Sequence, residues 1–182
     1  MVIAKSALAA AERMASSRLP RETGGILLGV RADSDVYVAD VVEVADDQST
    51  GSRFVLREVA RKEALARYRS DVPPDCPFGY VGTWHSHPAL AAGSSRDIRT
   101  LRHEAKTVQD LVAMLILMSA SDGVWLVEGA VGYRKWVIAR RAGRREAWHP
   151  LVAKADVILP LSGQPAPPGC GMPDGADGQG SP

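Results

Sequence analysis

The chain has 182 residues, of which 46% are hydrophobic and 24% are charged, and its 22 basic and 21 acidic residues give a formal net charge of +1. This length and composition allow one globular domain whose core is large enough to be stable without disulfide bonds. The balanced charge excludes a bulk electrostatic attraction to nucleic acid or to an anionic membrane, so any partner has to be inferred from a specific site.

Cysteine usage and hydropathy predict a soluble cytoplasmic protein. Cys76 and Cys170 lie far apart, which excludes a disulfide framework and a CxxC metal site. Charged residues such as Lys5 and Glu12 interrupt the N-terminal segment, so we expect no signal peptide. The longest apolar run, residues 111–118, is too short to span a membrane and is typical of a buried strand.

The spacing of apolar residues in the first half of the chain predicts a helix, two strands that form a hairpin, and a second helix. Their expected ranges are residues 3–17, 24–30, 36–44 and 57–70. Pro20 ends the first helical pattern. Glu22 is therefore expected at the junction between a helix and a strand.

In the second half, β-branched, aromatic and apolar runs predict four strands, and a charged pattern predicts one further helix. We expect strands over residues 78–85, 111–118, 124–127 and 133–140, a helix over 95–108, and tight turns at 121–123 and 129–132. The predicted fold class is α/β, a mixed sheet with about three helices in a domain spanning residues 1–160. Residues 161–182 are rich in Gly and Pro and predict a disordered tail.

His85 and His87 are the first candidate metal ligands. Alternate residues of a strand share a face, so these two imidazoles project to one side, and Trp84 and Ser86 project to the other. Asp97 falls in the first turn of the helix expected over 95–108, from which its carboxylate can return to the imidazoles. Two imidazoles and one carboxylate, with a fourth position left to water, are typical of a catalytic zinc site.

Two further residues would complete a hydrolytic site. Zinc lowers the pKa of water toward neutrality, and a carboxylate must then accept the proton and pass it to the leaving group. Glu22, beside a pair of glycines, is the candidate for this role. The hydroxyl of Ser94 is a candidate to stabilise the developing oxyanion.

Each of these residues also has an ordinary structural interpretation. A bare HxH pair is often solvent-facing, Ser94 and Asp97 have the spacing of a helix capping box, and an isolated glutamate such as Glu22 usually lies on the surface. The combination of all of them in one chain is what favours the metal site.

Three segments resemble the JAMM metalloproteases, which are the catalytic MPN domains. They are ETGGILLG over residues 22–29, GTWHSHP over 82–88 and SSRD over 94–97, which follow the family pattern of a Glu, then HxHP, then SxxD. The resemblance covers about residues 1–140. It implies a curved mixed sheet flanked by helices, similar to the cytidine deaminase fold. For the site it implies zinc on His85, His87 and Asp97, acid–base catalysis by Glu22, and oxyanion support from Ser94.

The resemblance also implies an activity and partners. Family members hydrolyse peptide or isopeptide bonds after the C-terminal glycines of ubiquitin or ubiquitin-like proteins, and bacterial members act on small β-grasp modifiers or sulfur carriers. A Gly-Gly tail is expected to bind extended, by strand addition in a narrow groove. The expected partners are such a ubiquitin-like protein or its conjugates, and E1-like or E2-like proteins of the same operon.

The chain departs from the family pattern between the second histidine and the serine. Residues 88–93 supply six residues where the family usually has seven. Counting from Ser95 would restore seven but would place Ile98 where the acid belongs, so Ser94 and Asp97 are retained. Only a short turn follows residue 118, so the long insertion that gives eukaryotic deubiquitinases their linkage choice is missing.

Three other functions are weighed against this one. A non-catalytic MPN scaffold would typically have lost the metal ligands, which this chain keeps. A zinc deaminase needs an HxE motif and a paired CxxC, and neither occurs here. A hydrolase that releases an amino acid such as cysteine from a sulfur-carrier protein would share every catalytic residue and stays open.

We expect His103, His149 and a basic cluster to be ordinary surface residues, the cluster being Arg140, Arg141, Arg144 and Arg145.

Overall fold

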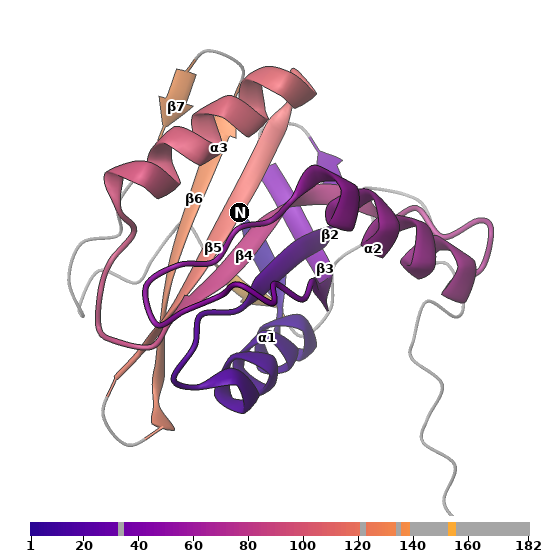
Figure 1. Cartoon of the computed structure of the whole chain (residues 1–182). Coiled ribbons are helices and arrows are strands. Elements are labelled where there is room, and N and C mark those ends of the chain that lie inside the picture. The colour runs from indigo at the N-terminus through magenta and orange to yellow at the C-terminus, as the bar shows by residue number, and fades with distance from the viewer. Residues whose placement is uncertain (33–34, 121–122, 134–135, 139–152, 156–182) are drawn as a thin grey trace, which may run out of the picture.

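Within the part of the chain that the computed structural model describes, a curved, eight-stranded mixed sheet carries three helices (Figure 1). The structure describes residues 1–32, 35–120, 123–133, 136–138 and 153–155. The helices are α1 (Lys5–Arg18), α2 (Glu58–Asp71) and α3 (Ser95–Val108). The strands are β1 (Val2–Ala4), β2 (Gly24–Ala32), β3 (Asp35–Glu43), β4 (Gly79–His87), β5 (Leu111–Ser119), β6 (Trp125–Tyr133), β7 (Trp136–Ile138) and β8 (Ala153–Ala155).

Strand β4 lies inside the sheet, whose order is β7-β6-β5-β4-β2-β3-β1-β8. It pairs antiparallel with β2 and parallel with β5. The β4–β5 crossover contains α3, as a parallel connection requires. The end of β4 that carries the two histidines therefore has a strand on each side and the start of α3 nearby.

The helices cover both faces of the sheet, and the alternation of side chains along β5 shows this directly. Ala113, Leu115 and Leu117 pack in the cluster that includes the buried alanines of α1. The intervening residues pack with Leu101 and Ala105 of α3, and these are Val112, Met114, Ile116 and Met118. Because β5 is buried on both sides, it is a continuous apolar run rather than an alternating one.

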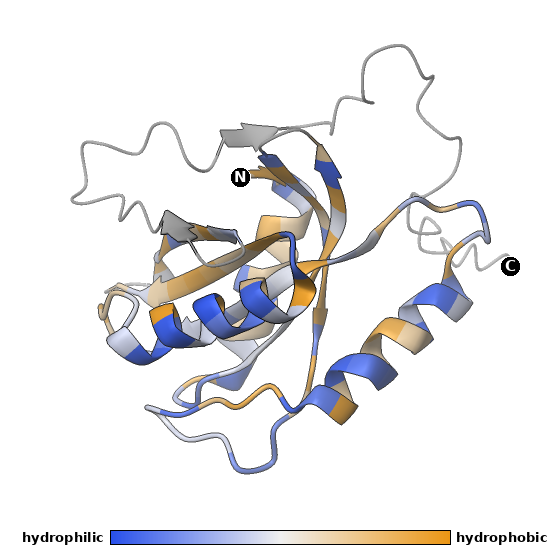
Figure 2. Ribbon diagram, turned by 90° about the horizontal axis from the view of Figure 1, so that it is seen from above, coloured by the Kyte–Doolittle hydropathy of each residue, from blue (hydrophilic) through white to orange (hydrophobic). Residues whose placement is uncertain are grey.

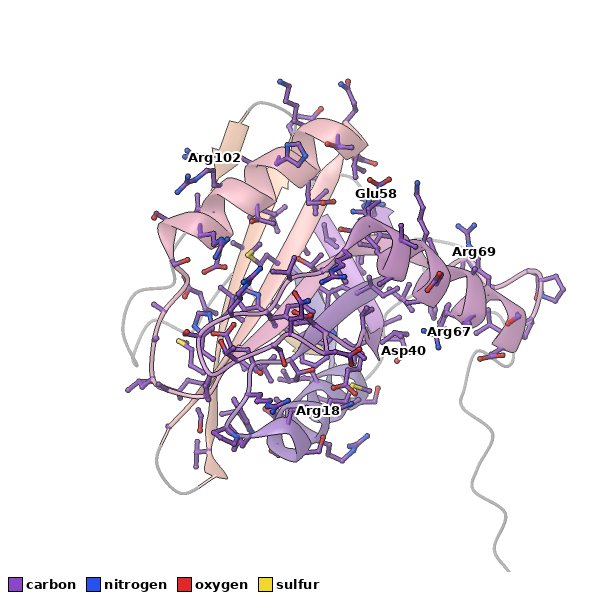
Figure 3. The ribbon with its side chains drawn as sticks, in the orientation of Figure 1. Arg18, Asp40, Glu58, Arg67, Arg69 and Arg102 are labelled. Carbon is purple, nitrogen blue, oxygen red and sulfur yellow. The ribbon has the colours of Figure 1, made fainter. Side chains whose placement is uncertain are left out.

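Helix α2 covers a third, smaller cluster. Its buried Ala64 packs with Ile26 and Leu28 of β2 and with Val44. The outward faces of α2 and α3 are mostly hydrophilic (Figure 2), and charged side chains such as Arg67, Arg69 and Arg102 are exposed there (Figure 3). No helix in the described ranges has both the length and the apolarity that a membrane crossing demands.

Most of the expected elements are confirmed, but the two ends of the sheet differ. Residues 2–4 form β1, and the first helix begins at Lys5 rather than at residue 3, because Val2 and Ile3 pair with β3. The predicted strand over 124–127 and the turn at 129–132 are wrong, since β6 runs unbroken from Trp125 to Tyr133.

The glycine that suggested a turn serves a packing role within β6. A Cβ atom on Gly132 would lie 3.1 Å from Leu101 Cγ and 3.1 Å from Ala105 Cβ. Gly132 therefore lets α3 approach the sheet closely. Of the strand expected over 133–140, the structure shows β7 at Trp136–Ile138.

The C-terminal expectations fall on residues that the structure does not describe. These are the basic cluster at residues 140–145, His149, Cys170 and the tail over 161–182. His103 is exposed on α3, as expected of a surface residue.

Replacing Gly132 with valine tests the close packing of α3. The added side chain would overlap Leu101 and Ala105, so we expect a loss of about 1–3 kcal/mol in the free energy of unfolding. Gly79→Val is the matched control, because nothing lies within 4 Å of a Cβ at Gly79. It should stay within about 0.5 kcal/mol of the parent protein. Urea unfolding of both variants measures the difference, and equal stabilities would contradict this account of Gly132.

Candidate metal centre

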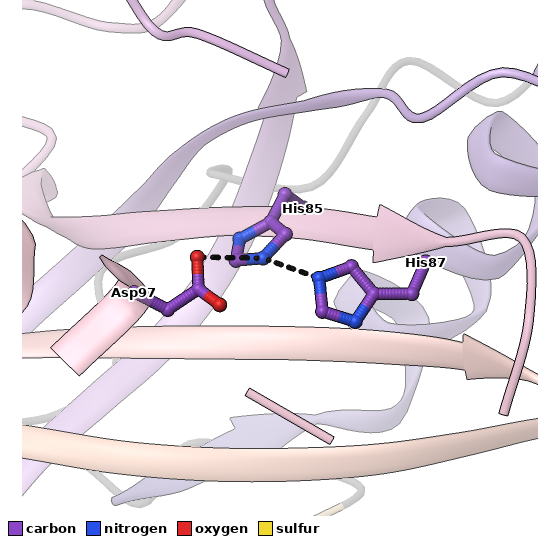
Figure 4. A group of neighbouring side chains, drawn as sticks. All are labelled: His85, His87 and Asp97. Atoms are coloured by element: carbon purple, nitrogen blue, oxygen red, sulfur yellow. Dashed lines mark hydrogen bonds and ion pairs between the residues drawn. The ribbon is translucent and has the colours of Figure 1, made fainter. Parts of the chain in front are cut away.

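The two histidines project from one face of β4, as their spacing predicted. His85 pairs with Ile116 and His87 with Met118 on β5, and those two partners belong to the cluster under α3. On the opposite face, Trp84 is fully buried and Ser86 is 1% exposed. The imidazoles therefore lie on the α3 side of the sheet (Figure 4).

Asp97 reaches the histidines from the first turn of α3. Ser94 caps this helix, and a capping box forms in which the Asp97 amide donates to the Ser94 hydroxyl (3.3 Å). In return, Asp97 Oδ2 accepts from the Ser94 amide and hydroxyl, both at 2.6 Å. The other oxygen, Oδ1, lies 3.5 Å from His85 Nε2.

The spacing of the three side chains fits a small metal ion. His85 Nε2 and His87 Nε2 are 3.1 Å apart, and the three donor atoms all lie within 4.8 Å of one another. Donors at tetrahedral corners about 2.0–2.1 Å from a zinc ion would be roughly 3.3 Å apart. Two imidazole nitrogens and a carboxylate oxygen therefore form a donor set that can hold such an ion.

A backbone contact orients His87. Its Nδ1 lies 2.6 Å from the carbonyl oxygen of Ala91. A carbonyl only accepts, so Nδ1 carries a proton, and in the neutral tautomer Nε2 is the nitrogen with the lone pair, 3.1 Å from His85 Nε2. A ring nitrogen held in this way is the usual second contact of a metal-binding histidine.

The protonation states of His85 and Asp97 also suit a metal. Burial lowers the pKa of His85 to about 4, although the negative charge of Asp97 opposes the shift. Burial alone would raise the pKa of Asp97, but the hydrogen bonds from Ser94 and the proximity of His85 outweigh it and lower that pKa. Near neutral pH the site offers a neutral imidazole and an ionised carboxylate, the forms that bind metals.

Glu22 lies beside this group, in the segment between α1 and β2. Gly24 at the start of β2 pairs antiparallel with His85, so Glu22, two residues earlier, comes beside His87. Its side chain is buried, with 8% exposed. The expectation that Glu22 lies at a helix-to-strand junction is thus confirmed, and the ordinary interpretation as a surface glutamate is wrong.

The surroundings of Glu22 favour its protonated form. Burial raises its pKa, and the neighbouring Asp97 carboxylate adds to the rise. His87 and a backbone hydrogen bond from Phe54 act in the opposite direction and do not cancel the effect. A carboxyl group with a raised pKa is a stronger base than a free carboxylate and can still return the proton.

Ser94 is placed differently from the other candidates. Its hydroxyl donates to Asp97 Oδ2, so the structure links it to the site through the carboxylate that it caps. The capping box is confirmed, while a role for Ser94 in oxyanion stabilisation stays a prediction. The structure thus gathers four candidates in one place, and Ser94 contacts the group through Asp97.

One buried acid near the site was not foreseen. Glu128 on β6 is 8% exposed and accepts a hydrogen bond from the Gly93 amide (2.8 Å). The only signal in the sequence was an acidic residue directly after the apolar stretch Trp125–Val127. That signal was lost because the strand was expected to end at residue 127.

The comparisons with known proteins give the family. The model for prokaryotic homologs of the JAB domain matches residues 4–139. The chain belongs to this family. The resemblance to MPN domains is therefore confirmed, and so is the expected fold, a curved mixed sheet flanked by helices.

The solved structures that are similar to the chain include two whose likeness can be stated in numbers. The solution structure of protein DSY2949 from Desulfitobacterium hafniense has a TM-score of 0.62 at 18% identity, covering 86% of this chain and 94% of that one. A JAB1/MPN domain protein from Archaeoglobus fulgidus, AF2198, has a TM-score of 0.43 at 18% identity, covering 74% and 91%. At this identity the first likeness supports the fold alone. No curated protein matches the chain.

Replacing Ser94 with alanine tests whether this helix cap orients the Asp97 carboxylate. The variant loses both hydrogen bonds of the Ser94 hydroxyl, so we expect it to lose about 1 kcal/mol of stability. We also expect zinc affinity to fall by about tenfold, since the carboxylate loses its orientation.

Ser95→Ala is the matched control, because this neighbouring serine is exposed and starts the helix without capping it. Calorimetric zinc titration and thermal unfolding of both variants measure the two effects. If the two serine variants bind zinc equally well, the cap does not orient the ligand.

Proposed function

We propose that the protein is a zinc metalloprotease that hydrolyses the peptide or isopeptide bond after the C-terminal glycines of a ubiquitin-like protein. The observation that carries this proposal is the His85, His87 and Asp97 donor group with the buried Glu22 carboxyl beside it. Membership of the JAB family supports the proposal, since this family includes hydrolases.

The surroundings of each side chain suit it to one of two roles, zinc binding or proton transfer. The two imidazoles and Asp97 would hold the zinc ion, and its Lewis acidity would polarise the scissile carbonyl and make water easier to deprotonate. Glu22 would accept the proton from water and deliver it to the leaving amine. Its raised pKa suits both steps, because a carboxyl that is too acidic returns a proton poorly.

The proposed substrate follows from the family resemblance. A tail ending in two glycines has no side chains to obstruct its approach to a metal held by side chains of a sheet and a helix. The reaction would be removal of the modifier from a conjugate or processing of its precursor, as in a bacterial, deubiquitinase-like conjugation or antiphage system. E1-like or E2-like proteins encoded in the same operon would be its partners, and the cytoplasm its compartment.

Metal content is the first test. We expect about one equivalent of zinc in the purified protein and a higher melting temperature when zinc is restored after chelation, because zinc binds the folded donor group. His85→Ala should lose both effects. His103→Ala is the matched control, because His103 is exposed on α3 away from the donor group and should bind zinc normally. Less than about half an equivalent, unchanged on adding zinc, would exclude the mechanism.

Glu22→Gln separates catalysis from metal binding. The variant keeps the size of the side chain but cannot accept a proton, so we expect hydrolysis to fall by about 10²–10⁴-fold while zinc content stays at the wild-type level. The substrates are ubiquitin-like proteins from the same genome, extended beyond their Gly-Gly ends by a short peptide. Mass spectrometry of the products locates the cleaved bond.

The same assay distinguishes the alternatives. Cleavage of a sulfur-carrier protein ending in an added cysteine, without cleavage of longer extensions, would favour the amino-acid-releasing hydrolase. If the wild-type protein binds zinc but cleaves no extended ubiquitin-like protein, the result contradicts the proposed protease activity and favours a scaffold.

A further inference from the structure

Glu128 is a buried carboxylate that the proposed reaction does not use. This residue lies in the middle of β6 and is 8% exposed, and its Oε2 accepts a hydrogen bond from the Gly93 amide at 2.8 Å. Burying a carboxylate is costly unless its hydrogen bonds compensate. The bond from the Gly93 amide supplies such compensation, so the function of Glu128 depends on what this bond does for the loop.

The strand register places Glu128 on the face of the sheet that carries the metal ligands. His85 pairs with Ile116 of β5, and Ile116 pairs with Glu128 of β6. Residues directly paired across strands point to the same side, and neighbouring strands are about 4.8 Å apart. Glu128 is therefore on the α3 side, in the row of His85 and roughly 10 Å from it.

The hydrogen bond to Gly93 acts on the loop that connects the ligands. Residues 88–93 join β4 to the cap of α3. His87 holds this loop at the Ala91 carbonyl, and Glu128 holds it at the Gly93 amide. A Cβ on Gly93 would lie 2.8 Å from Ile116 Cδ1, so the loop backbone rests directly on the sheet at this point.

Gly93 immediately precedes Ser94, whose amide and hydroxyl both bind Asp97 Oδ2. Whatever fixes the peptide at Gly93 also fixes the position from which Ser94 holds the metal-binding carboxylate. The negative charge of Glu128 additionally lies close to the N-terminus of α3, where the helix dipole favours an anion.

We propose that Glu128 is a positioning residue for the metal centre, which holds Gly93 and, through the Ser94 cap, sets the Asp97 carboxylate. This inference rests on the metal binding proposed above. The loop of residues 88–93 would then have a defined function, because it is held at Ala91, at Gly93 and at its junction with the Ser94 cap.

Cobalt(II) titration tests the proposal, since visible absorption reports both affinity and the geometry of the ligands. We expect E128A to bind cobalt about tenfold more weakly than wild type, with an altered absorption spectrum. E128Q retains an amide oxygen that can accept from Gly93, so it should stay within about threefold of wild type and keep the spectrum.

Glu104→Ala is the matched control for general loosening of α3. Glu104 lies two turns beyond Asp97 on the same helix and binds Arg61 and Tyr80, away from the loop. We expect this variant to lose stability without a change in the cobalt spectrum. A similar loss of cobalt affinity in E104A and E128A would overturn the specific role of Glu128.

The remaining outcomes separate this inference from the proposed function. If wild type binds cobalt and E128A matches it in affinity and spectrum, the positioning role is wrong and the metal site stands. If wild type binds neither cobalt nor zinc, both proposals fall. Should E128A not fold by circular dichroism, E128Q and E128D decide the matter. The shorter aspartate withdraws the acceptor from Gly93, so E128D must weaken binding more than E128Q.

Discussion

Asp97 Oδ2 accepts two hydrogen bonds from Ser94, and through them the start of α3 and the carboxylate of the candidate metal site are built as one unit. A helix N-terminus has amides without partners inside the helix, and a capping acid satisfies them. Here that acid has a second oxygen, and it lies 3.5 Å from His85 Nε2. The bonds that begin the helix therefore also orient a candidate metal ligand, which explains how Ser94 is linked to the site through Asp97.

The close pairing of strands β2 and β4 brings the remaining residues of the site together. A Cβ on Gly24 would lie 2.4 Å from the Trp84 carbonyl oxygen and 2.9 Å from His85 Cβ. Only glycine permits β2 to pair with β4 at this position, and that pairing brings Glu22 beside His87. The ligands and the proposed base thus come together because a strand pair and a capped helix end meet at one place.

The sequence predicted what depends on local periodicity. His85 and His87 share a face because strand side chains alternate, and Asp97 falls in the first turn of a helix that Ser94 caps. Prediction failed where tertiary packing overrides local preference. Gly132 suggested a turn, yet it lies within β6. Its missing side chain leaves room for Leu101 and Ala105 of α3.

Residues whose role depends on long-range pairing were also hard to foresee. The short strand β1 forms by pairing with β3 on one side and β8 on the other, and the first helix is correspondingly shorter. Glu128 joins the metal centre through two successive strand pairings and a contact to Gly93, 35 residues away in the chain. Motif spacing therefore identifies the candidate ligands, whereas the groups that contact them from distant parts of the chain emerge only from the fold.

The two carboxyl groups beside His87 differ in a way that explains their proposed roles. Burial acts to raise the pKa of both Glu22 and Asp97. Asp97 accepts two hydrogen bonds from Ser94 and lies beside His85, so its pKa is lowered and it stays ionised as a ligand. For Glu22, His87 and a backbone hydrogen bond from Phe54 oppose the effect of burial without outweighing it, and its pKa remains raised. Neighbouring acids whose surroundings shift their pKa values in opposite directions are suited to different tasks, here metal binding and proton transfer.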